Sequence, residues 1–102
     1  MEIKDVENLL DYHSSIRVSD HALREAHKES LHARDIFYAI LNGKIIEHYR
    51  DRKRLLIVGP IRKQDLKLHV ICSYNNDDAE IAIVTVYIPD RPKWLNELVR
   101  AT

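Results

Sequence analysis

Three side chains in the second half of the chain belong to types that carry proton-transfer chemistry. His69 lies within a run of alternating apolar and polar residues, where a histidine can titrate near neutral pH and act as general acid or base. Thr85 and Tyr87 lie in the next such run and add a hydroxyl and a phenol. Whether the three side chains meet depends on the strand register, which the sequence leaves open. A histidine on a half-buried strand can equally be a structural residue.

A carboxylate and a phenol, Glu47 and Tyr49, directly precede the most basic stretch of the chain. Arginine and lysine side chains in such a stretch can neutralise the phosphates of a nucleic acid, although a charge run is often only a solvated turn. Glu47 can also be an ordinary ion-pair partner of these cations. The candidates for phosphate contact are Arg50, Arg52, Lys53, Arg54, Arg62, Lys63 and Arg100.

Other common kinds of site lack the residues that they need. The chain has six histidines, but His21 and His27 are six positions apart in an expected helix and point to different sides, and no cysteine or carboxylate pair completes a metal site. Two glycines cannot form a phosphate-binding loop, and no serine has the glycine context of a hydrolase nucleophile. The single cysteine, Cys72, is expected to be buried and inert. We therefore expect no metal and no cofactor.

The composition is that of one small globular domain. The 102 residues, 45% of them hydrophobic and 31% charged, suffice for one core. No apolar run reaches the roughly 20 residues that span a bilayer, and the N-terminus lacks a signal pattern, so we expect a cytoplasmic protein without a membrane partner. Residues 1–43 hold 5 basic and 8 acidic side chains, whereas residues 44–102 hold 11 and 8, which favours an anionic partner for the second half.

The spacing of apolar residues is helical in the first part of the chain. It predicts helices over residues 2–12, 20–28 and 33–41, with Ser19 as the N-cap of the second. The third helix is expected to end at Asn42-Gly43, where the glycine would supply a left-handed backbone conformation. Residues 16–18 are too few for more than an extended link or a short edge strand.

The apolar spacing changes to a period of two after Gly43. It predicts strands over residues 44–49, 55–58, 66–74 and 79–88, and Pro89 and Pro92 end the last of them before a final helix over 92–100 anchored by Trp94. This order predicts an α+β fold in which the helices pack on one face of a four-stranded antiparallel sheet. The expected core includes Leu9, Leu10, Phe37, Ile40, Leu41, Val70, Val84 and Val86.

Short motifs spread over residues 16–100 form a recognisable combination. They are Ser19-Asp20-His21-Ala22, Asp35-Ile36, the segment from Ala39 to Tyr49, the segment from Leu68 to Ile71, the segment from Thr85 to Asp90, and Trp94. Together they resemble a small prokaryotic family of uncharacterised domains, DUF4258, which is similar in fold to the RelE/ParE and barnase-like group of ribonuclease toxins. The resemblance implies a RelE/barnase-like fold, RNA as a substrate, and a small zinc-finger antitoxin-like protein as a partner.

The same resemblance implies a set of site residues and a mechanism. The matching candidates are His21, Glu47, Tyr49, His69, Thr85 and Tyr87. In metal-independent cleavage by attack of the RNA 2′-hydroxyl, His69 would be the general acid or base and Tyr87 or Glu47 its counterpart, with the two roles left open.

The chain departs from the family pattern in the second expected helix and just after it. Where the family has arginines this chain has Glu25 and Glu29, and where the family has a glycine it has Ser30. The two glutamates and the neutral overall charge favour the alternative, a non-catalytic protein-binding or regulatory module of the same fold.

Overall fold

The structure, a computed structural model, describes residues 3, 5–13, 15–62, 64–75, 80–89, 94–96 and 99–100. The described elements are α1 (Val6–Tyr12), β1 (Ser15–Val18), α2 (Asp20–Lys28), α3 (Ala33–Leu41), β2 (Lys44–Tyr49), the 3-10 helix η1 (Arg50–Arg52), β3 (Arg54–Pro60), β4 (Lys67–Tyr74), β5 (Glu80–Tyr87), β6 (Trp94–Asn96) and β7 (Val99–Arg100). The fold is therefore α+β, as the sequence predicts.

The main sheet has five strands in the order β1-β5-β4-β3-β2. The four strands β2 to β5 pair antiparallel, in agreement with the prediction. The prediction is wrong for the sheet as a whole, because β1 pairs parallel to β5 and makes the sheet mixed. β1 has only four residues, and its partner lies far along the chain, so no local pattern in the sequence indicates the pairing.

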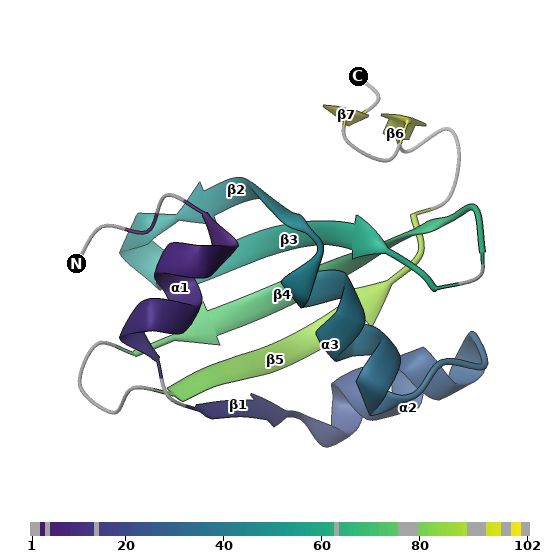
Figure 1. Ribbon diagram of the computed structural model, residues 1–102, viewed down its shortest axis with the longest axis horizontal. Coiled ribbons are helices and arrows are strands. Elements are labelled where there is room, and N and C mark those ends of the chain that lie inside the picture. Colours follow the sequence, from purple (N-terminus) through teal and green to yellow (C-terminus); the bar gives the residue numbers. More distant parts are fainter. Residues whose placement is uncertain are drawn as a thin grey trace.

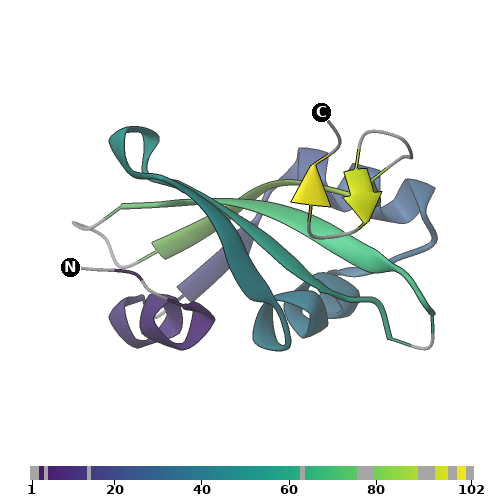
Figure 2. The same ribbon diagram turned by 90° about the horizontal axis from the view of Figure 1, so that it is seen from above.

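The helices α1 and α3 lie on one side of the sheet, and α2 lies in line with β1 beside β5 (Figures 1 and 2). The main core fills the space between these helices and the sheet. It includes the fully buried residues Leu9, Ala22, Ala26, Ile36, Ile40, Leu55, Ile57, Leu68, Val70, Cys72, Ile81, Ile83 and Val86.

The expected core residues divide into three groups. Leu9, Ile40, Val70 and Val86 are buried as predicted, and Leu10 packs against the core while partly exposed. Phe37 is only half-buried. The prediction is wrong for Leu41, which is 63% exposed because it lies at the end of α3, and for Val84.

A β-bulge explains the error at Val84. Ile71 pairs with Thr85 and the next residue, Cys72, pairs with Ile83, so that Val84 is the extra residue of β5. The bulge reverses the alternation of the strand, and the buried residues before it are Ile81 and Ile83 instead of their even-numbered neighbours.

The bulge is held by the residue that caps α2. The Ser19 hydroxyl donates a hydrogen bond to the Val84 carbonyl oxygen at 3.0 Å and accepts one from the Ala22 amide at 3.0 Å. The Ser19 amide donates to the Ile83 carbonyl oxygen at 3.1 Å. One side chain thus starts α2, as predicted, and fixes the helix to the irregular part of β5.

Gly43 is needed for space and not for a left-handed backbone, which corrects the prediction made for it. The cap residue of α3 is Asn42 with φ −111°, and no described glycine has a positive φ. A Cβ atom on Gly43 would lie 2.4 Å from the Ala39 carbonyl oxygen, and one on Gly59 would lie 1.9 Å from the same atom. Both glycines therefore allow α3 to pack directly on the backbone around β3.

The left-handed residue after α2 is Ser30, with φ 61°. The Leu31 amide donates to the Ala26 carbonyl oxygen and the Ser30 amide to that of His27, the hydrogen bonds of a Schellman motif. Glycine has no Cβ penalty in this conformation, so Ser30→Gly is expected to raise the free energy of unfolding by about 0.5–1 kcal/mol. Urea unfolding measures the change. The matched control Ser15→Gly, in β1, is expected to lower the free energy of unfolding, and a destabilised Ser30→Gly variant would contradict the cap assignment.

The end of the chain contains a short pair of strands where a helix was expected. β6 and β7 pair antiparallel, with Trp94 opposite Arg100. Tryptophan and valine favour strands, and an isolated helix of about nine residues is marginal in water, which accounts for the error. The rest of the expected helix, residues 92, 93, 97 and 98, and the proposed anchoring role of the Trp94 side chain lie outside what the structure describes.

Candidate functional site

His69 and Tyr87 lie directly opposite each other on β4 and β5. Their ring centroids are 5.1 Å apart and the rings are tilted by 41°. Val70 and Val86, the neighbours of these two residues, point into the core beneath the helices, so the two rings lie on the opposite face of the sheet. The register that the sequence left open therefore brings the histidine and the phenol together.

Thr85 and Glu47 lie on this same face, in the next row of residues across the strands. The row runs from Glu47 through Leu56 and Ile71 to Thr85. Thr85 is two residues from Tyr87, about 7 Å along β5. Glu47 is on β2, two strands from His69 and three from Tyr87, and strands are about 4.8 Å apart. The structure thus groups Thr85 with His69 and Tyr87 and leaves Glu47 at a distance.

The members of this group differ in exposure. His69 is 0% exposed, whereas Thr85 and Tyr87 are half-buried. His69 has Val58 opposite it on β3, and Val58 and Leu56 form a second, smaller buried cluster with Ile46 and Ile71 packed against it. A molecule that approaches this face therefore meets Tyr87 and Thr85 before it meets His69.

The other two candidates, His21 and Tyr49, lie at opposite borders of the sheet. His21 is exposed in the first turn of α2, next to the cap that binds β5 through Ile83 and Val84. Tyr49 ends β2 and is 39% exposed. Neither is in the two cross-strand rows that carry His69, Tyr87 and Thr85.

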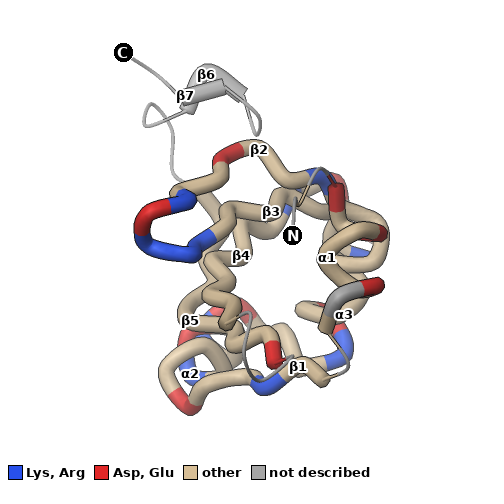
Figure 3. The backbone as a smooth tube through the Cα atoms, turned by 90° about the vertical axis from the view of Figure 1, so that its left-hand side faces the viewer, with Lys and Arg blue, Asp and Glu red and all other residues tan. Residues whose placement is uncertain are grey.

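Most of the basic candidates form the turn between β2 and β3. Arg50, Arg52, Lys53 and Arg54 are all exposed there, and Lys53 has a left-handed backbone with φ 52°. Figure 3 shows this turn as a mostly basic loop that projects beyond the strands. Arg62 is exposed after β3, Lys63 lies outside the described residues, and only the backbone of Arg100, in β7, is described.

A second group of titratable residues, which the sequence did not reveal, lies on the helix-covered face. The Tyr74 hydroxyl and His48 Nε2 share a hydrogen bond of 2.7 Å, and the ring of His13 meets that of Tyr74 edge-on at 6.0 Å. His13 is 5% exposed; its Nδ1 donates to the Leu9 carbonyl oxygen, and its Nε2 has no hydrogen-bond partner among the described residues. These residues come from α1, β2 and β4, and no sequence spacing connects them.

The environment of His48 and Tyr74 favours the neutral forms of these two side chains. Burial lowers the pKa of His48, and the nearby Arg50 guanidinium lowers it further. Burial raises the pKa of the Tyr74 phenol, an effect that Arg50 partly opposes. The hydrogen bond between the Tyr74 hydroxyl and His48 Nε2 needs no charge on either group, since each can donate or accept in its neutral form. Elsewhere in the core, burial raises the pKa of the Cys72 thiol to about 12, as expected for an inert packing residue.

The lowered pKa of His48 makes stability depend on pH. The unfolded chain binds a proton at the ordinary pKa of about 6.5 and the folded protein only at lower pH, so acidification through this range favours unfolding. His48→Gln removes this titration. We expect the melting temperature of the variant to fall less than that of the parent when the pH is lowered from about 7.5 to about 5. His27→Gln, at an exposed position on α2, is the control, and equal losses in parent and His48→Gln would contradict the assignment.

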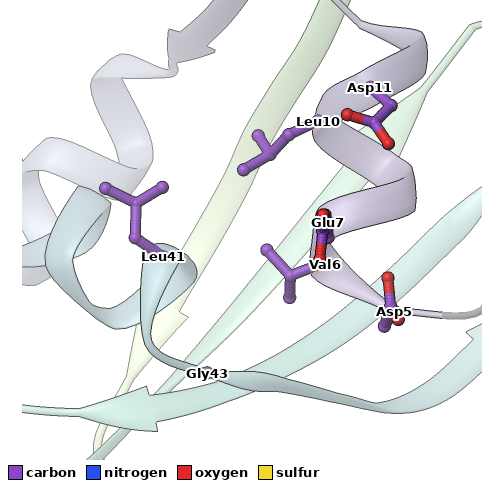
Figure 4. A pocket seen from close by; sticks show the side chains of 7 residues that line it. All are labelled: Asp5, Val6, Glu7, Leu10, Asp11, Leu41 and Gly43. Carbon is purple, nitrogen blue, oxygen red and sulfur yellow. The ribbon is translucent and has the colours of Figure 1, made fainter.

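A hollow of about 530 Å³ lies on the helix side, between α1 and the end of α3. Val6 and Leu10 of α1 point across it toward Leu41 (Figure 4). Its rim carries the carboxylates of Asp5, Glu7 and Asp11. Three carboxylates repel a polyanion, so this hollow is not where RNA would bind. In the part of the chain that the structure describes, no group of three or more histidine, cysteine or acidic residues could hold a metal ion, and no helix is long and apolar enough to cross a membrane.

A comparison with known protein families identifies the family of this chain. The family model described as "Domain of unknown function (DUF4258)" matches residues 18–88, more than half of the chain. The chain belongs to the DUF4258 family. No curated protein and no solved structure gave a significant match.

The DUF4258 match contains most of both groups of titratable residues. It spans α2, α3 and the strands β2 to β5, and therefore His69, Tyr87, Thr85 and Glu47 on one face of the sheet. It also contains His48 and Tyr74 on the other face, whereas His13, the C-cap residue of α1, lies outside it.

Proposed function

We propose that this DUF4258 protein is a toxin-like endoribonuclease, which cleaves RNA at the sheet face that carries His69 and Tyr87. The observation that carries the proposal is the direct pairing of these residues across β4 and β5, with ring centroids 5.1 Å apart. Cleavage through the 2′-hydroxyl needs one group that removes the proton of this hydroxyl and another that protonates the leaving 5′-oxygen. A histidine beside a phenol offers two such groups within reach of one phosphate.

The two proposed reacting side chains, His69 and Tyr87, differ in their exposure to solvent. Tyr87 and Thr85 are partly exposed and would meet the RNA first. His69 is fully buried, so the substrate would reach it only after neighbouring side chains move. In the reaction the 2′-oxygen bonds to phosphorus, the bond to the 5′-oxygen breaks, and a 2′,3′-cyclic phosphate remains. Cationic side chains would stabilise the extra negative charge on the phosphorane.

The proposal includes the partner that the family resemblance implies. A small zinc-finger antitoxin-like protein would bind the toxin and cover the sheet face, and the reaction would take place in the cytoplasm, where RNA is the substrate. The partner would then add to the shielding of His69, which is already buried in the free protein.

A non-catalytic binding module is the second candidate, and the complete burial of His69 favours it. In that case the His69–Tyr87 contact would be a packing interaction, and the face would hold a protein without proton transfer. The neutral overall charge, with 16 basic and 16 acidic residues, is compatible with a protein partner.

The experiment that separates the two candidates is incubation of the purified, partner-free protein with a mixture of RNAs in the presence of EDTA. The nuclease proposal expects fragments that carry 2′,3′-cyclic phosphate ends, detected by mass spectrometry, and no cleavage of DNA of the same sequence. Intact RNA at every pH tested would contradict the nuclease and leave the binding module.

A further inference from the structure

Two exposed lysines lie at the end of the sheet that is remote from the Arg50–Arg54 turn. Lys44 begins β2 and Lys67 begins β4, next to Pro60 at the end of β3 (Figure 1). Neither lysine forms an ion pair with another described residue. Their charges are therefore available to a ligand, in contrast to Arg17, whose Nε lies 3.1 Å from the Glu80 carboxylate.

The two lysines lie on the same face of the sheet as the His69–Tyr87 pair. Lys44 pairs with Val58, Val58 with His69, and His69 with Tyr87, which places the four residues in one row across the sheet. Within this row Lys44 is two strands from His69 and three from Tyr87. Lys67 is two residues before His69 on β4 and so lies on the same face, about 7 Å further along the strand. The long lysine side chains can reach over Val58 toward a group held beside His69.

A hollow of about 180 Å³ lies between the two lysines. It is lined by Asn42, Lys44, Val58, Gly59, Pro60 and Lys67. This is several times the share of about 30 Å³ that one water molecule occupies in the liquid, so a phosphate group fits. Two unpaired ammonium groups at the rim of a hollow give a site for an anion with more than one charged oxygen.

The turn with Arg52, Lys53 and Arg54 is further from the reacting pair. Arg54 and Val58 are four residues apart on β3, about 14 Å, whereas Pro60 and Val58 are two apart, about 7 Å. A phosphate held between Lys44 and Lys67 is therefore nearer to the His69–Tyr87 pair than one held by the turn. The turn would contact a more distant nucleotide of the same strand.

We propose that Lys44 and Lys67 form a subsite for an RNA phosphate next to the His69–Tyr87 pair. This inference rests on the proposed function, because it takes RNA as the ligand of this face. The inference goes beyond the proposed function because it assigns the positive charge near the reacting phosphate to Lys44 and Lys67, which begin β2 and β4, and not to the arginine-rich turn.

The test measures binding apart from cleavage. The probe is a labelled single-stranded 2′-O-methyl oligoribonucleotide, which cannot be cleaved through its 2′-oxygen, and fluorescence anisotropy gives its Kd over a range of salt concentrations. Lys44→Ala/Lys67→Ala is compared with Arg24→Ala/Arg34→Ala, which removes two exposed cations from α2 and α3. Loss of two phosphate contacts is expected to raise Kd on the order of tenfold and to reduce the slope of log K against log salt by about 1.4, while the control keeps the parent slope.

Each outcome decides one of the two proposals. An equal effect of both double variants, an unchanged slope in Lys44→Ala/Lys67→Ala, or no binding of the probe by the parent overturns the lysine subsite. If the probe binds through the lysines and unmodified RNA stays intact, the subsite stands and the nuclease fails. If RNA is cleaved and the lysine variant binds with the parent slope, the nuclease stands and the subsite fails.

Discussion

His69→Ala is expected to slow RNA cleavage by roughly two to four orders of magnitude, the loss typical of a missing general acid or base. Tyr87→Phe keeps the ring that lies against His69 and removes only the phenol oxygen, so a similar loss is expected from it. Because both residues would act on one phosphate, the double variant should be little slower than the slower single variant. Single-turnover cleavage of one RNA substrate measures all three rates.

Substitution of a buried histidine can also reduce the cleavage rate because it destabilises the fold, so the stability of each variant has to be measured together with its rate. His69 is fully buried, and His69→Ala leaves a cavity that lowers stability whatever the role of the ring. His69→Gln fills most of this space, and Tyr87→Phe changes the packing little, so both are expected to unfold near the parent urea concentration. The control His27→Ala, at an exposed position of α2, should keep the parent rate. A folded Tyr87→Phe variant with the parent rate would remove the phenol from the mechanism.

The β-bulge in β5 leads to the second large expected effect. The same substitution at the adjacent residues Ile83 and Val84 should change the stability of the protein by very different amounts. Ile83 is fully buried in the main core, so Ile83→Asp places an unpaired charge there. The cost of several kcal/mol is comparable with the whole stability of a small domain, and the variant is expected to be unfolded. Val84 is the half-buried extra residue of the bulge, and Val84→Asp is expected to melt cooperatively, with a loss of about 1–2 kcal/mol.

Thermal melts followed by circular dichroism compare the two variants directly. A folded Ile83→Asp protein together with an unfolded Val84→Asp protein would mean that β5 alternates without a bulge, as its sequence pattern alone predicts. That result would change the phase of residues 80–83 and leave Thr85 and Tyr87 on the face of His69, because the pairs His69–Tyr87 and Ile71–Thr85 lie on the other side of the bulge.

The elements with long, regular patterns could be predicted from the sequence. Val70 was expected in the core and Cys72 was expected to be buried, and the structure confirms both. The phase of β5 could not be predicted, because the bulge depends on Ser19, which binds the Val84 carbonyl oxygen from a distant part of the chain. The parallel pairing of β1 is likewise decided by long-range contacts.

The candidate site could likewise be predicted only in part. Alternation placed His69 and Tyr87 on the less apolar faces of neighbouring strands, and the register of the β4–β5 pair then set them opposite each other. The burial of His69 was not predictable, since its neighbours across the strands, Val58 on β3 and Tyr87 on β5, are set by the strand pairing. The separation of Glu47 from Tyr87 follows from the spatial order of the strands, which puts β3 and β4 between them.

The most direct test of the central claim uses one RNA and a copy of it in which the nucleotide 5′ to the cleaved bond carries a 2′-deoxyribose. The partner-free protein is incubated with both, and the cleavage at this bond is followed over time. Attack by the 2′-hydroxyl at the His69–Tyr87 face predicts cleavage of the RNA and none at the substituted position. Equal cleavage of both molecules, or of neither, would contradict it.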